Sequence, residues 1–216
     1  QFEKAKANDP AKVAEFYNKA MRAKGLTEEV YLHIEELKKY LIATTSGKSS
    51  IEEVEADSLF KLKNVDSKDN YDIPTLHLIG GDPAKPRDGE WSATELKTKI
   101  DNFKQELLYL FEDETERNAL SLGLNTDGEF KDASGVKESW ISANFYHLPL
   151  AAVVTNLSKI QADIRNAEAD IIKALYRNIS ADDFKFDTLA AKVIPRSTYV
   201  IQGDSFIADV IVAAFS

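Results

Sequence analysis

Few residue patterns in this chain have the types and spacing that chemistry requires. The three histidines, His33, His77 and His147, lie in different predicted elements. None belongs to a Glu-x-x-His or His-Glu-x-x-His pattern, which would place metal ligands on one helix face. We therefore expect histidines at helix surfaces or caps. The adjacent Glu35 and Glu36 diverge by about 100° on a helix, so they cannot bracket a substrate as an acid and base pair must.

One loop imitates part of a calcium site. Asn125, Asp127 and Gly128 match the middle of an EF-hand loop, but its first ligand position would be Gly123. Its twelfth position, which needs a bidentate Glu, would be Ser134. No glycine-rich phosphate loop, nucleophile elbow or Ser/His/Asp group can be assembled either. The sequence therefore predicts no catalytic, cofactor-binding or metal-binding residue and no cofactor, and it indicates that the protein is not an enzyme.

The bulk composition excludes several classes of partner. With 216 residues and 44% hydrophobic composition, the chain can bury a substantial core, and its length fits one domain plus part of another. A net charge of −9 has the wrong sign for binding nucleic acid or an anionic membrane surface. The absence of cysteine removes disulfides and thiolate sites but leaves the compartment open. The longest apolar runs, 148–154 and 210–215, are far shorter than the ~20 residues needed to span a bilayer.

Two long helices dominate the predicted fold. Residues 149–178 carry apolar side chains at alternating spacings of three and four, which is the pattern of a helix with one buried stripe: Leu150, Val153, Leu157, Ile160, Ile164, Ala167, Ile171 and Ala174. Residues 9–42 carry a similar series: Val13, Phe16, Ala20, Ala23, Thr27, Val30, Ile34, Leu37 and Leu41. The phase of the first series continues through Gly25, which favours one helix, although a kink there is an open alternative.

Two further helices have start signals. Ser92 and Glu95 form a capping box that opens a helix predicted to run to about Ala119. Ser50 and Glu53 open a short candidate helix over 51–59, inside an otherwise irregular segment from 47 to 91. The fold class predicted for the larger part of the chain is therefore mainly α, a bundle of long helices.

The hydrophobic period changes to two after Asn178. Residues 184–194 and 199–215 read as strands, so we expect a helical bundle domain over 1–182 and the N-terminal strands of a truncated β-sandwich domain over 183–216. The last alternation runs to Ser216, which suggests a piece of a longer protein and a strand edge that awaits pairing. The candidate interaction edge strand consists of Phe206, Ala208, Val210, Val212 and Ala214.

Two segments resemble the GldM/PorM family of gliding-motility and type IX secretion proteins. They are Gly135-Val-Lys-Glu-Ser-Trp140 and the run from Asn144 to Asp170. The resemblance extends more loosely to the first helix and to 199–204, which is similar to the opening strands of the family's second domain, an immunoglobulin-like β-sandwich. No functional residue of the family can be transferred onto these positions.

The resemblance implies a non-enzymatic structural subunit. It implies a homodimer in the periplasm, tethered to the inner membrane by a transmembrane helix absent from this chain. The expected partners are the inner-membrane ring protein GldL/PorL and, through domains absent here, the outer-membrane-associated GldK/GldN (PorK/PorN). Such a subunit transmits proton-driven motion across the periplasm.

One alternative from another class stays open. The chain could be a periplasmic ligand- or peptide-binding sensor module, in which segment 47–91 forms a pocket over the helices. A sensor module predicts a monomer with a ligand-dependent thermal shift, whereas a shaft predicts a ligand-indifferent dimer. The sequence also leaves open whether the long helices pack within one chain or across a dimer.

Overall fold

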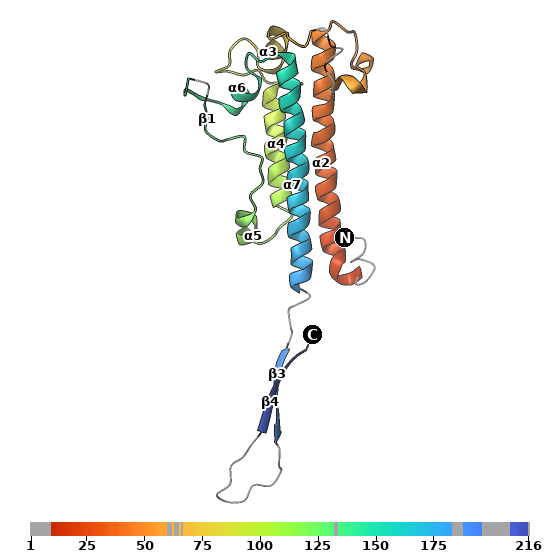
Figure 1. The fold of residues 1–216 in the computed structure, drawn as a ribbon, viewed down its shortest axis with the longest axis vertical. Coiled ribbons are helices and arrows are strands. Elements are labelled where there is room, and N and C mark those ends of the chain that lie inside the picture. The colour runs from red at the N-terminus through yellow and green to blue at the C-terminus, as the bar shows by residue number, and fades with distance from the viewer. Residues whose placement is uncertain are drawn as a thin grey trace, which may run out of the picture. The chain divides into compact units, whose positions relative to one another are not determined.

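The computed structural model describes residues 10–59, 62, 65, 67–131, 134–182, 188–195 and 208–215. The chain divides into two compact units, Gln1–Leu175 and Tyr176–Ser216. The first is helical, and its long helices α2 (Pro10–Thr45), α4 (Ala93–Leu108) and α7 (Leu150–Asp182) lie side by side (Figure 1). The shorter helices α3 (Asp72–Leu78) and α6 (Trp140–Phe145) lie at the end of this unit where α2 stops and α7 starts.

The first long helix, α2, runs without interruption over Pro10–Thr45. The prediction of one helix through Gly25 is therefore confirmed. Its predicted start at Asp9 and the side chain of Val13 lie outside the described residues. At the other end Gly47 has a φ of 66°, and the Lys48 amide donates to the Ala43 carbonyl over 2.9 Å. This is the left-handed C-terminal cap that glycine favours.

The second long helix, α7, covers Leu150–Asp182. Every residue of its predicted apolar stripe from Leu150 to Ala174 is buried, as are the predicted positions of α2 from Ala20 to Leu41. The third member of the bundle, α4 (Ala93–Leu108), buries Leu96, Ile100, Phe103 and Leu107. The core of the first unit is therefore built where these three apolar stripes meet.

Ion pairs join the helices on the bundle surface. Arg22 of α2 pairs with Glu106 of α4 over 2.7 Å, and Glu28 of α2 pairs with Arg165 of α7 over 2.7 Å. Both α4 and α7 begin at the end of the bundle where α2 stops, so both are antiparallel to α2 (Figure 1). Ion pairs also form along α7 itself, for example between Lys159 and Asp163 at 2.7 Å. Such exposed pairs contribute only a few tenths of a kcal/mol, about 0.2–0.5 each.

The prediction that the capped helix continues to about Ala119 is wrong. The Ser92 hydroxyl does accept from the Glu95 amide over 3.1 Å, but α4 ends at Leu108 and a separate helix, α5, covers Glu114–Ala119. The Asp113 carboxylate caps α5 by accepting from the Thr115 amide. An aspartate at this position competes with continuation of the preceding helix, because it offers the backbone a new start.

The segment after α2 is more ordered than predicted. The candidate helix over 51–59 is divided into two 3₁₀ turns, η1 (Ile51–Glu53) and η2 (Ala56–Leu59). A further helix, α3 (Asp72–Leu78), was not predicted. Its start is stabilised by the Asn70 side chain, which accepts from the Ile73 amide over 2.9 Å.

A short hairpin and helix lead into α7. Strand β1 (Phe130–Lys131) pairs antiparallel with β2 (Lys137–Glu138), and α6 covers Trp140–Phe145. The first turn of α7 is tied to the segment before α3, because the Leu150 and Ala151 amides donate to the Asn70 and Lys68 carbonyls, each over 2.9 Å. Backbone groups that open a helix are satisfied here by a distant loop rather than by a capping side chain.

The second unit contains the described strands β3 (Thr188–Pro195) and β4 (Ala208–Phe215). They form an antiparallel pair in which Thr188 lies opposite Phe215 and Pro195 opposite Ala208. The predicted change from helix to strand is therefore confirmed. The immunoglobulin-like sandwich stays a prediction, and the predicted strand residues 184–187 and 199–207 lie outside the described residues.

Candidate functional site

The structure brings two of the three histidines into one ring cluster, which we define as His33, Tyr40, His77 and Trp91. The rings of His33 and Trp91 are stacked with centroids 5.4 Å apart, and Trp91 is stacked on Tyr40 at 5.5 Å. The Tyr40 hydroxyl and the His77 Nδ1 are 2.7 Å apart and share a hydrogen bond. The cluster therefore joins α2, α3 and the start of α4.

Burial governs the electrostatics of the ring cluster. Desolvation lowers the pKa of His33, against the influence of Glu95. It also lowers the pKa of His77, with help from the Arg87 guanidinium. Both effects favour the neutral imidazole. Trp91 has a φ of 61°, and its amide donates to the Glu95 carboxylate over 2.8 Å. These contacts fasten the segment before α4 onto α2.

No metal site emerges from the described part of the chain, where no three His, Asp or Glu side chains are grouped to hold an ion. The loop that imitates an EF-hand is held by its own contacts. Asp127 pairs with Lys97 of α4 over 2.8 Å, and the Asn125 side chain accepts from the Asp127 amide over 3.2 Å. Glu35 pairs with Lys39 on the same helix at 3.8 Å, as expected of a surface carboxylate.

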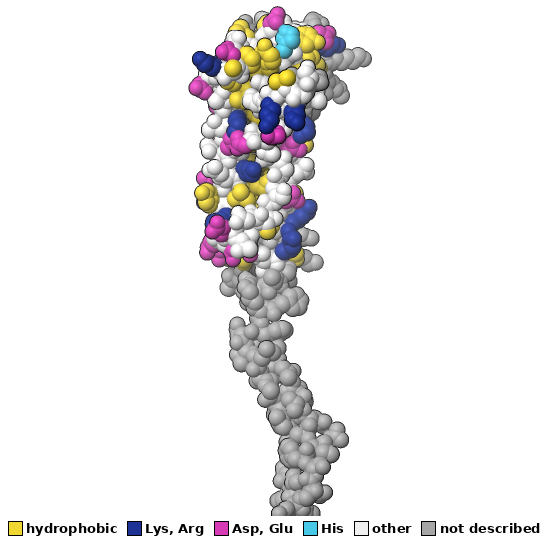
Figure 2. Space-filling view, turned by 90° about the vertical axis from the view of Figure 1, so that its left-hand side faces the viewer, with side chains coloured by type: hydrophobic (Ala, Val, Ile, Leu, Met, Phe, Trp, Pro, Cys, Tyr) yellow, Lys and Arg dark blue, Asp and Glu magenta, His cyan; other side chains and the backbone are white. Residues whose placement is uncertain are grey.

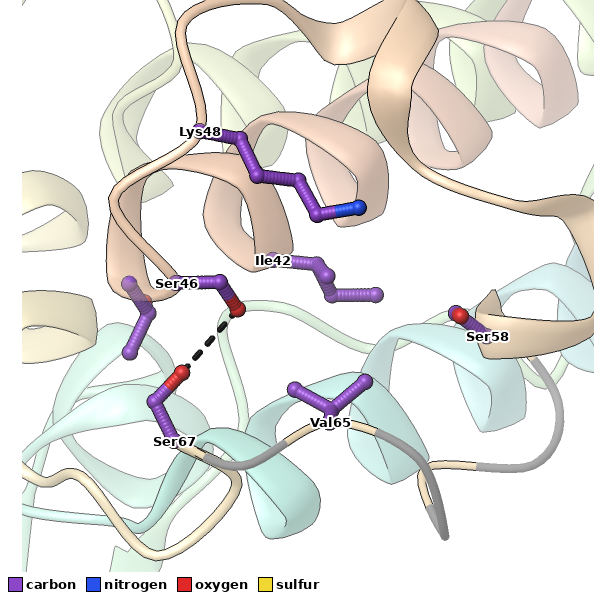
Figure 3. Close-up of a pocket in the computed structure, with 7 residues that line it drawn as sticks. Ile42, Ser46, Lys48, Ser58, Val65 and Ser67 are labelled. Carbon is purple, nitrogen blue, oxygen red and sulfur yellow. Dashed lines mark hydrogen bonds between the residues drawn. The ribbon is translucent and has the colours of Figure 1, made fainter.

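A pocket of about 440 Å³ lies at the end of α2, lined by Ile42, Thr45, Ser46, Lys48, Ser58, Val65 and Ser67. Figure 3 shows the hydroxyls of Ser46 and Ser67 facing one another, joined by a 3.0 Å hydrogen bond. The Lys48 ammonium donates to the Glu53 carbonyl. The described lining residues offer hydroxyls, one ammonium and an apolar floor, which are groups that can bind a small polar molecule.

Apolar side chains gather on the surface of the first unit where α3 and α6 lie (Figure 2). Tyr71, Leu76 and Tyr146 are exposed there. The His147 ring lies 5.5 Å from that of Tyr71, and the His147 amide donates to the Thr75 hydroxyl over 3.1 Å. Exposed tyrosines on a fixed backbone are typical of surfaces that bind proteins. His147 is thus a surface residue outside the ring cluster.

The predicted edge strand is paired along the part that the structure describes. Ala208, Val210, Val212 and Ala214 belong to β4 and lie opposite residues 195, 193, 191 and 189 of β3. Phe206 lies outside the described residues. Whether this strand also pairs with another chain stays a prediction.

Sequence reasoning missed a polar contact inside the bundle. Lys38 of α2 and Gln161 of α7 are both buried, and the Lys38 ammonium donates to the Gln161 side-chain oxygen. Both flank apolar stripes, where a long polar residue usually reaches solvent. Spacing alone could also not predict the ring cluster, although the separation of His33 and Tyr40 by two helical turns places them on one face of α2.

A comparison with protein-family models assigns the chain to a family. The model of the GldM N-terminal domain matches residues 1–178. The chain belongs to the GldM family. No curated protein matches this GldM-family chain. Membership associates it with the gliding-motility and type IX secretion apparatus, as a structural component in the periplasmic part of a complex anchored in the inner membrane. Among its described helices, none is long and apolar enough to cross a membrane.

Proposed function

We propose that this chain is a non-enzymatic shaft segment, which transmits motion from a proton-driven motor in the inner membrane toward the outer-membrane gliding and type IX secretion apparatus. In this proposal it lies in the periplasm, tethered to the inner membrane by a transmembrane helix. Its residues bind and position other subunits and perform no reaction.

The observation that supports this proposal is the uninterrupted buried stripe of α7. It runs from Leu150 to Ala174, and each of its predicted positions is buried. Burying a Leu, Ile or Val side chain contributes roughly 1.5–3 kcal/mol. Separating α7 from its neighbours would expose several such side chains at once and would lose the sum of their burial free energies. Helices joined in this way move as one rigid body, which is what transmission of a displacement requires.

The proposal includes the organisation and partners of the subunit. Residues 1–182 form the helical bundle domain, and residues 183–216 open an immunoglobulin-like β-sandwich. The chain acts as a homodimer, contacts the GldL/PorL ring, and reaches GldK/GldN (PorK/PorN) through further domains. The strand from Phe206 to Ala214 is the candidate edge for pairing with further strands.

Secretion in cells tests the role. Leu157→Asp or Ile164→Asp places a carboxylate in the buried stripe, and we expect either change to unfold the bundle and abolish type IX secretion. His33→Ala and His147→Ala are the matched controls, expected to leave secretion near normal. Loss of secretion in a histidine variant that retains its fold would contradict a shaft without a chemical site.

The pocket at the end of α2 favours a second candidate function. Four of its lining residues, Lys48, Ser58, Val65 and Ser67, belong to segment 47–91, which the sensor alternative places over the helices. A sensor would show a ligand-dependent rise in unfolding temperature, lost in Lys48→Ala and Ser67→Ala, and those variants would impair signalling. The shaft proposal instead expects both pocket variants to secrete normally.

A further inference from the structure

A charged side chain lies inside the helical bundle. Lys38 is only 1% exposed and follows the buried stripe residue Leu37 on α2. Its ammonium donates a hydrogen bond to the side-chain oxygen of Gln161 on α7. Burying an ammonium costs desolvation free energy that its polar partners often offset only in part. Stability alone is therefore a poor reason for a lysine at this position.

Gln161 contacts α2 at two places. The residue is 5% exposed, and besides accepting from Lys38 its Nε2 donates to the backbone carbonyl of Tyr31 over 3.0 Å. Tyr31 and Lys38 are seven residues, or about two helical turns, apart on α2. The Gln161 amide thus contacts two points along the α2 axis and is satisfied only where both are within reach.

The apolar stripes do not by themselves fix how far α7 sits along α2. A spacing of three and four repeats every seven residues, so a slide of about 10.5 Å brings Leu157 to the place of Ile164 and again matches apolar to apolar. Buried polar residues distinguish such alternatives, because they have partners in one register only.

We infer that Lys38 and Gln161 form a register lock, a buried polar pair that fixes the axial position of α7 along α2. A seven-residue slide in one direction puts Val154 in the place of Gln161, and the ammonium loses this acceptor. A slide in the other direction puts Glu168 there, but Gln161 then moves to the place of the buried Val154, away from Lys38 and Tyr31. Either slide separates the Gln161 amide from both Lys38 and Tyr31, and the loss of these two hydrogen bonds disfavours it. The lock concerns the fold itself and does not depend on the proposed transmission role.

Crosslinking between the helices tests the lock in the intact chain. The chain has no cysteine, so each variant with two introduced cysteines can crosslink only between those two positions. Glu28→Cys with Arg165→Cys marks the native register, since those side chains form a 2.7 Å ion pair. Glu28→Cys with Ser158→Cys, or with Ile172→Cys, marks the two slipped registers. Yields are measured with a short bifunctional thiol reagent, in the parent and in Lys38→Met/Gln161→Leu.

We expect the parent to crosslink in the native pair alone. The apolar double variant should fold with an equal or higher Tm, as buried polar pairs replaced by apolar residues often do, and its slipped pairs should crosslink several-fold more. Exclusive native crosslinking in the double variant would overturn the lock. So would failure of that variant to fold, because the pair would then serve stability instead of register.

Thr27→Val is the matched control. Thr27 is another buried polar residue of α2, but its hydroxyl donates to the Ala23 carbonyl of its own helix over 2.9 Å. Removing that hydroxyl leaves the contacts between α2 and α7 unchanged. We expect only the native crosslink in Thr27→Val. If the slipped crosslinks also rose in Thr27→Val, their rise in the double variant would follow from removing any buried polar group and not from removing the lock.

Discussion

At the scale of the residue, Lys38 should give the chain an alkaline stability signature. Desolvation lowers its pKa from 10.5 to about 8, against the raising influence of Glu35. Between about 8 and 10.5 the unfolded chain holds more protons than the folded chain, so the free energy of unfolding rises with pH across that window. We predict that the parent gains stability relative to Lys38→Met there, as measured by urea unfolding. The exposed Lys159→Met is the control, and a constant difference between parent and Lys38→Met would contradict the assignment.

The two histidines of the ring cluster should make the folded chain less stable in acid. The pKa of His33 and that of His77 are lowered below 6.5, mainly by desolvation. Their neutral forms are fully available to the folded state above 6.5, and stability is lost as pH falls from 6.5 through the lowered values. We predict a smaller acid-induced drop in Tm for His33→Phe, which keeps a ring against Trp91. An unchanged drop would exclude His33 as its source, and His147→Phe on the exposed surface is the comparison.

Single residues show where sequence reasoning stops. The spacing of Leu157, Ile160 and Ile164 predicted their burial, because an apolar period specifies a helix face directly. The burial of Lys38 depends on what α7 places opposite it, and no local pattern contains that information. The stacking of Trp91 on His33 depends likewise on the path of the segment before α4.

At the scale of the element, two glycines should respond in opposite ways to alanine. A Cβ built on Gly25 within α2 would meet nothing within 4 Å, whereas Gly47 has a φ of +66°. Alanine removes the helix penalty of glycine at the first site, worth about 0.8–1 kcal/mol, and is strained at the second. We predict that Gly25→Ala raises the free energy of unfolding and that Gly47→Ala lowers it, as measured by chemical denaturation. Destabilisation by Gly25→Ala would indicate that another surface approaches α2 at this position.

Truncation along α7 should distinguish its two faces. Leu157 is fully buried, so Leu157→Ala removes packed atoms and leaves a cavity, at a cost of about 2–5 kcal/mol. Lys159→Ala, two residues away on the exposed side, should lie within about 0.5 kcal/mol of the parent. Calorimetric Tm values for the pair provide the check. Similar costs at both positions would contradict a helix held by one stripe.

The long helices were predictable because their hydrophobic period persists over many turns, so a local exception such as Gly25 does not hide it. The short elements were not predictable in this way. The six-residue α5 and the start of α3 depend on single capping groups, Asp113 and Asn70. The two-residue strands β1 and β2 are too short to show a period at all.

At the scale of the whole molecule, family membership and the bundle lead to the same proposal. The GldM N-terminal domain model matches residues 1–178, and within the first unit three apolar stripes bind α2, α4 and α7 together. A body joined in this way suits mechanical work. Net charge and composition excluded nucleic acid, but only the resemblance indicated secretion, since a shaft has no catalytic signature.

The most direct test of motion passing through this chain is secretion by cells whose subunit has a flexible insertion. A short Gly-Ser segment between Asp182 and Asp183 would let the two proposed domains move independently, while the same segment between Gly81 and Asp82 lengthens an exposed turn. Type IX secretion is measured with both proteins present at parental amounts. We predict that the first insertion abolishes secretion and the second leaves it near normal. Normal secretion with the insertion after Asp182 would contradict a rigid shaft.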